Sequence, residues 1–331
     1  MRIVKVNKDS IANILSDLLK RSPTNYGDFQ DKVDAIIKNV RDNGDKAVFD
    51  YTAQFDKAEI NADNILVTEE EIKEAYEEVD DELIKVIRKA IKNIRDFHEK
   101  QIQKSWFETR EDGVMLGQKV TPMETCGVYV PGGKAVYPSS VLMNIVPAHV
   151  AGVKNIIMTT PPGKDGKVTA NTLVAAKEAG ATKVYKVGGA QAIAAMAFGT
   201  ESIPKVDKIV GPGNIFVALA KKAVYGNVSI DSIAGPSEIL VLADETANPR
   251  YVAADLLSQA EHDEMASAIL VTTSEELAHK VSDEIDGFLN QLSRKEIMEK
   301  SLDSFGYILV ASDMKEAIDT ANAIASEHME I

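Results

Sequence analysis

The chain has 331 residues, of which 45% are hydrophobic, enough for a sizeable core and more typical of two domains than of one. Its 37 basic and 51 acidic residues give a formal charge of −14, which argues against a nucleic-acid partner because such a surface repels polyphosphate. No apolar run approaches the roughly 20 residues that a membrane span requires, and the N-terminus has the pattern of neither a signal peptide nor a transit peptide. Cys126 is the only cysteine, so the composition excludes an intrachain disulfide and predicts a globular protein of the cytoplasm.

Residues 1–110 are predicted to be mainly helical. Thr68 and Glu71 have the spacing of a capping box at the start of one helix. From Leu83 to Phe97, apolar residues recur at helical spacing and predict a single buried stripe. His98 adjoins this stripe, and we expect it to pack at its edge and not to act as a ligand.

The pattern changes near residue 113. Residues 113–133 alternate between polar and apolar positions as strands do, and they end in a glycine turn. Short runs of β-branched and aliphatic residues follow, each succeeded by a segment of helical length, which is typical of βαβ units around a parallel sheet. The sequence therefore predicts the α/β fold class.

Three glycine-rich turns follow predicted strands: VGGAQ (187–191), VGPGN (210–214) and IAGPSE (233–238). In open α/β sheets, ligands bind at the carboxyl ends of the strands. Each turn carries a neutral hydrogen-bonding side chain suited to a nucleotide, namely Gln191, Asn214 and Ser237. The dinucleotide fingerprint is incomplete, however, because Phe216 occupies the position of its third glycine. Each turn alone is equally consistent with a tight turn whose Asn or Ser caps a helix, but three in one segment favour a ligand site.

Two polar clusters suggest further chemistry. Gln259 and His262 are three residues apart, so on a helix they would share a face and could both bind zinc, although spacing alone favours a solvated surface. Glu327 and His328 could supply two acid–base groups, although the residues alone favour an ordinary polar helix end. Cys126 lies in a strand-like run, where a buried thiol is expected more than a nucleophile.

Taken together, these stretches resemble the histidinol dehydrogenase family. The matching segments recur in the family's order and at its intervals, and they are residues 127–143, 187–200, 205–221, 234–244, 255–263 and 326–331. The resemblance implies oxidation of L-histidinol through L-histidinal to L-histidine in histidine biosynthesis. It implies NAD as the hydride acceptor in both steps, and zinc as a second cofactor.

The resemblance also implies a role for each matched residue. Tyr129, Gln191 and Asn214 would contact NAD⁺, and Ser237 would contact histidinol.

The remaining roles fall on the two polar clusters. Gln259 and His262 would bind zinc and help to hold the substrate. His328 would contact the substrate and take the alcohol proton as hydride leaves, and Glu327 would activate the water that attacks the aldehyde.

The implied layout is two incomplete Rossmann-like lobes with mainly parallel sheets and a helical N-terminal region. Residues 1–126 with 238–331 would form a discontinuous first lobe that carries the zinc and acid–base residues. Residues 127–237 would form the second lobe, which binds NAD. The family forms homodimers, in which the partner subunit supplies one zinc ligand.

Members of the family continue beyond the Glu-His pair, and that part of the family supplies the other zinc ligands. We therefore expect this chain to bind zinc weakly and to turn over histidinol poorly. One alternative is a catalytically silent α/β fragment that keeps a nucleotide-binding surface. Another is an unrelated NAD-dependent dehydrogenase with Cys126 as its nucleophile.

Overall fold

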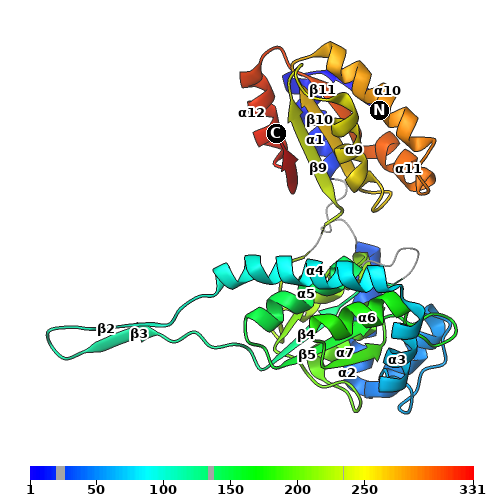
Figure 1. Ribbon diagram of the computed structural model, residues 1–331, viewed down its shortest axis with the longest axis vertical. Helices are drawn as coiled ribbons and strands as arrows, with labels where there is room; N and C mark the ends of the chain where they lie inside the picture. Colours follow the sequence, from blue (N-terminus) through cyan, green and yellow to red (C-terminus); the bar gives the residue numbers. More distant parts are fainter. Residues whose placement is uncertain (20–26, 133–137, 234) are drawn as a thin grey trace. The chain divides into compact units, whose positions relative to one another are not determined.

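The computed structural model describes residues 1–19, 27–132, 138–233 and 235–331 (Figure 1). Their contacts divide the chain into two units: unit 1 comprises residues 1–25 and 235–331, and unit 2 comprises residues 26–234. This division differs from the expected lobes, because residues 26–126 belong with the segment that follows them. Their helices are packed on the helices of unit 2, where the apolar stripe is covered.

Unit 2 contains a five-stranded parallel sheet in the order β6-β5-β4-β7-β8. Its strands are β4 (Thr125–Tyr129), β5 (Asn155–Thr160), β6 (Lys183–Lys186), β7 (Lys208–Val210) and β8 (Ser229–Ile230). Most β-branched and aliphatic residues of these strands are buried, on both faces, as expected for a parallel sheet covered by helices.

Helices cover both faces of this sheet in two layers. On one face, α7 (Gly189–Phe198) and α8 (Ile215–Val224) share a core with α2 (Gly27–Phe55). On the other face, the core is formed with α3 (Glu69–Glu78), α4 (Asp81–His98), α5 (Pro138–Val150) and α6 (Ala170–Ala179). The outer layer of each face is thus supplied by the helical N-terminal region.

Local sequence patterns correctly predicted two of these outer helices, α3 and α4. Thr68 and Glu71 form the predicted capping box of α3. In α4 the predicted stripe packs on the core through Ile84 and Ile87, which are buried. Phe97 is an exception to the buried stripe, since it is 61% exposed in the last turn of α4. That turn leads through η2 (Glu99–Gln101) into an exposed ribbon.

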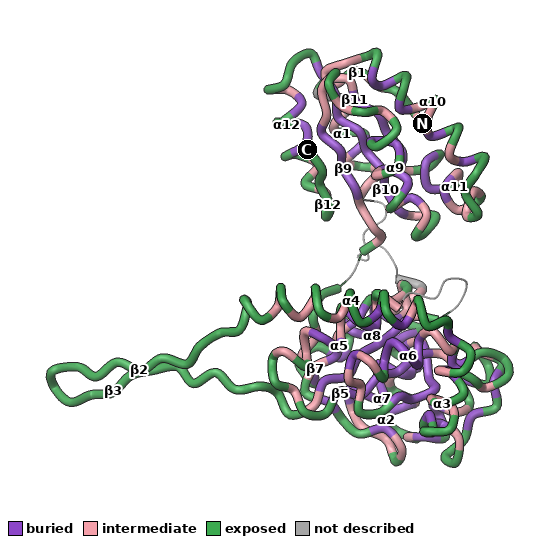
Figure 2. Tube along the Cα trace, viewed as in Figure 1, coloured by how far each residue is buried: buried purple, intermediate pink, exposed green. Residues whose placement is uncertain are grey.

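The ribbon consists of β2 (Trp106–Thr109) and β3 (Met115–Gln118), paired antiparallel. Every residue of both strands is exposed (Figure 2).

Unit 1 contains a second five-stranded parallel sheet, in the order β1-β11-β10-β9-β12. Its strands are β1 (Arg2–Lys5), β9 (Glu238–Ala243), β10 (Ser267–Thr272), β11 (Gly306–Val310) and β12 (His328–Glu330). One face is covered by α9 (Pro249–Ala260), α10 (Glu275–Leu289) and α11 (Lys295–Phe305), and the other by α1 (Lys8–Leu19) and α12 (Met314–Ile324).

The prediction of an α/β protein with two Rossmann-like lobes and mainly parallel sheets is confirmed. Among the described helices, none combines the length and apolarity needed to cross a bilayer.

Candidate functional site

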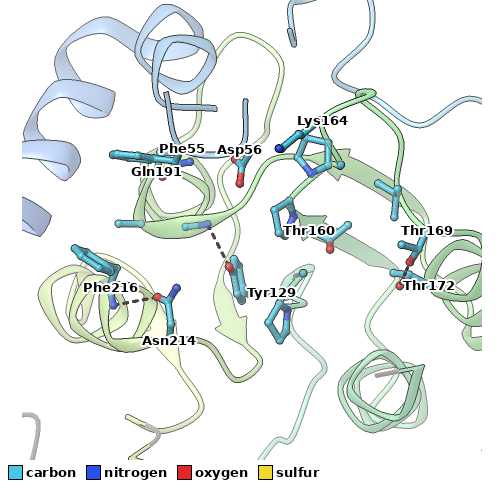
Figure 3. Close-up of a pocket in the computed structure, with 18 of the residues that line it drawn as sticks. Phe55, Asp56, Tyr129, Thr160, Lys164, Thr169, Thr172, Gln191, Asn214 and Phe216 are labelled. Carbon is cyan, nitrogen blue, oxygen red and sulfur yellow. Dashed lines mark hydrogen bonds between the residues drawn. The ribbon is translucent and has the colours of Figure 1, made fainter. Parts of the chain in front are cut away.

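Unit 2 has a pocket of about 630 Å³ at the carboxyl ends of its strands. Tyr129 ends β4, Thr160 ends β5, and Gln191 and Asn214 lie at the starts of the helices that follow β6 and β7 (Figure 3). The parallel strands bring these turns to one edge of the sheet, although they are distant in sequence. Tyr129, Gln191 and Asn214, which the sequence placed in separate motifs, therefore line one cavity.

Tyr129 is held rigidly in the wall of this pocket. Its side chain is buried, and its hydroxyl oxygen accepts a hydrogen bond of 3.1 Å from the backbone N–H of Gly189. Burial raises the pKa of Tyr129 to about 12. The phenol therefore stays neutral at physiological pH and keeps its proton as a hydrogen-bond donor.

Gln191 lies in the first turn of α7 and is 1% exposed. Its side-chain oxygen Oε1 has no hydrogen-bond partner among the described residues. An unsatisfied buried amide oxygen is unfavourable by about 1–3 kcal/mol in a folded protein. Its presence in a pocket wall is typical of a group whose partner is a ligand.

Asn214 is the N-cap of α8. Its Oδ1 accepts hydrogen bonds from the backbone N–H groups of Phe216 (3.1 Å) and Val217 (3.2 Å), so the helix-capping interpretation of this turn is confirmed. The cap and a ligand contact are compatible, because capping occupies the side-chain oxygen and the Nδ2 group has two hydrogens to donate.

Gly211 is required for the turn that carries Asn214. Its φ of 115° is one that side-chain-bearing residues rarely adopt, and a Cβ there would lie 2.0 Å from the carbonyl oxygen of Tyr129. Buried Lys221 donates to the Gly211 carbonyl over 2.8 Å, and Asp231 accepts from the Gly211 N–H over 2.8 Å. Since Lys221 and Asp231 also form an ion pair, both peptide groups of Gly211 are fixed.

Sequence reasoning missed several lining residues. Phe55 and Asp56 reach the pocket from the end of α2, and Lys164 and Lys167 reach it from the loop after β5. Burial raises the pKa of Asp56 to about 6. No motif marks Phe55 and Asp56, because their approach to the pocket depends on how α2 packs against α7 and α8.

In unit 1 the candidate residues lie at the amino ends of the strands. Ser237 immediately precedes β9, and its carbonyl accepts a 2.9 Å hydrogen bond from the N–H of Ser267 at the start of β10. A strand follows Ser237, so the alternative in which this serine caps a helix is wrong. Part of that turn, Ala234, lies outside the described residues.

Gln259 and His262 are at the same edge of the unit 1 sheet, where α9 returns to the start of β10. Gln259 is in the last turn of α9, whereas His262 lies beyond the end of the helix. The backbone N–H of His262 donates to the Gln259 carbonyl over 3.0 Å, so the chain keeps the two residues one turn apart.

Glu327 and His328 are exposed, and they do not form a helix end. Helix α12 stops at Ile324, and His328 begins the edge strand β12, opposite Ile239 of β9. This register places Glu327 and His328 at the amino edge that also carries Ser237.

Within residues 1–19, 27–132, 138–233 and 235–331, no three His, Cys, Asp or Glu side chains converge as they would around a metal ion. Gln259 and His262 are two donors, whereas a catalytic zinc usually has about three protein ligands. The described residues therefore do not complete a zinc site by themselves.

Cys126 is buried in β4, as predicted. Burial raises the pKa of its thiol to about 11, so the reactive thiolate is disfavoured at physiological pH. This environment argues against Cys126 as a nucleophile.

Comparisons with a family profile, with relatives and with a solved structure all indicate the same family. The sequence profile described as histidinol dehydrogenase matches residues 19–331. The histidinol dehydrogenase of Bacillus subtilis (strain 168) is 58% identical over 329 residues, which cover 99% of this chain and 76% of the relative. That of Clostridium acetobutylicum is 59% identical over 296 residues, 89% of this chain and 68% of the relative. A crystal structure of histidinol dehydrogenase from Elizabethkingia anophelis superposes with a TM-score of 0.91 at 40% identity, covering 99% of this chain and 75% of that one.

Proposed function

Because the chain belongs to the histidinol dehydrogenase family, we propose that it oxidises L-histidinol through L-histidinal to L-histidine, in histidine biosynthesis, with NAD⁺ as the hydride acceptor. The observation that carries the cofactor assignment is the convergence of Tyr129, Gln191 and Asn214 on one pocket of unit 2. Its volume of about 630 Å³ is in the range of cavities that hold small molecules and cofactors.

The chemistry of the pocket wall supports a dinucleotide. The Tyr129 hydroxyl and the Asn214 amide nitrogen offer hydrogen-bond donors, and the Gln191 amide offers both donors and an acceptor. The N-terminal turns of α7 and α8 adjoin the pocket, and helix N-termini favour phosphate through their N–H groups and dipoles. Lys164 adds positive charge for a diphosphate, whereas the charge of Lys167 is paired with Glu74.

We propose that Glu327 and His328 perform the proton transfers. The imidazole of His328 contacts the substrate and takes the alcohol proton as hydride leaves for NAD⁺, and the carboxylate of Glu327 activates the water that attacks the aldehyde.

The proposal also assigns Ser237, Gln259 and His262. Ser237 contacts histidinol, and Gln259 and His262 hold zinc and orient the substrate. Because these two donors are fewer than a catalytic zinc usually has, we expect zinc to bind weakly to this chain.

A homodimer completes the proposal. The exposed β2–β3 ribbon carries Trp106, Phe107 and Met115, which are 54%, 63% and 66% exposed. An isolated two-stranded ribbon is marginally stable in water, and exposed apolar surface of this kind favours coverage by another chain. Sedimentation of the chain should therefore report a dimer, and a monomer at micromolar concentration would refute this part of the proposal.

The decisive experiment measures NADH formed from L-histidinol and NAD⁺ with added zinc. We expect two NADH per histidinol from the wild-type chain and none from His328→Ala. His279→Ala removes an exposed histidine on α10 and should leave the rate unchanged. Saturable NAD⁺ binding without any turnover would instead favour the alternative of a nucleotide-binding fragment.

A further inference from the structure

Asp56 is a charged group in the pocket of unit 2 that the proposed reaction leaves without a role. It follows the last residue of α2, and its carboxylate points toward the cavity (Figure 3). Its backbone N–H donates to the Thr52 carbonyl over 2.9 Å, which anchors the residue to the end of the helix. The backbone of Asp56 is therefore held in place at the pocket wall.

One oxygen of the Asp56 carboxylate accepts no hydrogen bond from the described residues. This atom, Oδ2, is buried. A buried carboxylate oxygen without a donor is unfavourable in the folded protein, and burial is the cause of the raised pKa of Asp56. A carboxylate that served the fold would have a donor or a cation beside it, so its partner is expected to be a ligand.

The surroundings of Asp56 indicate which part of a dinucleotide it meets. Its neighbour Phe55 is 50% exposed at the pocket, and the ring stacks on Tyr51 with centroids 5.6 Å apart and planes within 8°. A fixed, half-exposed aromatic face suits an adenine base. The nicotinamide, in contrast, must remain open to the substrate for hydride transfer.

On this basis, and resting on the proposed use of NAD⁺, we propose that Asp56 is a further cofactor-binding residue that selects NAD⁺ over NADP⁺. Its two carboxylate oxygens accept hydrogen bonds from the 2′- and 3′-hydroxyls of the adenosine ribose. In NADP⁺ a 2′-phosphate replaces the 2′-hydroxyl, which removes one donor and places like charges together. Common dinucleotide folds use an acidic residue in the same way from within the sheet, whereas here the carboxylate comes from an added helix.

The test is calorimetric titration of the chain with NAD⁺ and with NADP⁺. Asp56→Asn keeps the size of the side chain and removes its charge. We expect it to weaken NAD⁺ binding about tenfold or more, the loss typical of a charged hydrogen bond, and to strengthen NADP⁺ binding, because the like charge is gone. The affinity ratio should therefore fall. Asp56→Glu keeps the charge and should still disfavour NADP⁺.

The matched control is Asp50→Asn, which removes the same charge from an exposed position on α2, outside the pocket. It should leave both affinities unchanged. The melting temperature separates binding from folding: a carboxylate without a protein partner can be neutralised without loss of stability, so Asp56→Asn should melt no lower than wild type.

Two results would overturn the inference while leaving the cofactor proposal intact. One is wild-type NAD⁺ affinity in Asp56→Asn, and the other is an unchanged preference for NAD⁺ over NADP⁺ in that variant. Failure of the wild-type chain to bind NAD⁺ at all would instead refute the proposed cofactor, and the role of Asp56 with it.

Discussion

The two parallel sheets of this protein carry their candidate residues at opposite edges. In unit 2, Tyr129, Gln191 and Asn214 lie where the strands end. In unit 1, the candidates lie where the strands begin or where helix α9 returns to the sheet, and they are Ser237, Gln259, His262, Glu327 and His328. The same architecture thus presents two different surfaces.

The difference is electrostatic. At the carboxyl edge of unit 2, helices α7 and α8 begin, and their N-terminal dipoles and N–H groups favour anions such as a diphosphate. At the amino edge of unit 1, α9 ends, and the negative pole of its dipole favours cations. A dinucleotide at the first edge, and a metal ion and an amine-bearing substrate at the second, each match the local field.

The largest effect is expected from a substitution in the turn at the carboxyl edge of unit 2. Gly211→Ala places a Cβ 2.0 Å from the Tyr129 carbonyl and strains a positive φ. We expect a loss of about 3 kcal/mol or more in the free energy of unfolding and no measurable NAD⁺ binding. Urea denaturation and titration with NAD⁺ measure the two effects.

Gly113→Ala is the matched control for that variant. Gly113 also has a positive φ of 83°, but no atom lies within 4 Å of its Cβ position. Its substitution isolates the conformational strain, so a much smaller loss of stability is expected. Equal losses in the two variants would show that the approach of Gly211 to Tyr129 does not matter.

A smaller effect is expected from the ion pair that fixes the same turn. Lys221→Met keeps the buried aliphatic stem and removes the donor to the Gly211 carbonyl and the partner of Asp231. Because Asp231 is partly exposed, we expect a loss of about 2 kcal/mol, less than for a fully buried pair. NAD⁺ binding should weaken as the turn loosens, while hydrogen exchange in β10 of unit 1 stays unchanged.

The neighbouring Lys222 is exposed, so Lys222→Met removes the same charge without touching the turn. Wild-type stability and NAD⁺ affinity are expected for it. If Lys222→Met weakens NAD⁺ binding as much as Lys221→Met does, the affinity depends on the positive charge of α8 and not on the geometry of the Gly211 turn.

How far the sequence predicts this molecule depends on the range of the interactions. Most strands from β4 to β10, the capping box of Thr68 and Glu71, and the cap at Asn214 depend on residues within a few positions, and their patterns predicted them. Which sheet the N-terminal helices cover depends on long-range packing, and local periodicity carries no such information. Asp56 escaped notice for that reason. The unit 1 residues stood out as a glycine-rich turn and two polar clusters, but their roles came from family resemblance, since the carboxyl-end rule points to the other edge of that sheet.

The smallest effect is expected from a change of pH. Burial raises the pKa of Asp56 to about 6, and only its charged form accepts hydrogen bonds from both ribose hydroxyls. NAD⁺ affinity of the wild-type chain should therefore fall about tenfold between pH 7 and pH 5, whereas that of Asp56→Asn should stay level. The other charged groups that line the pocket are Lys164 and Lys167, and Tyr129 remains neutral across this range.

Stability of the ligand-free chain should change in the opposite direction. A carboxyl whose folded pKa exceeds its unfolded value binds its proton more tightly when folded, so its contribution to stability grows as pH falls from about 6 toward 3.8. Comparing wild type with Asp56→Asn at pH 5 and pH 7 removes the contributions of the other carboxyl groups. Affinity and stability that fall together on acidification would show that Asp56 serves the fold of unit 2 and not its ligand.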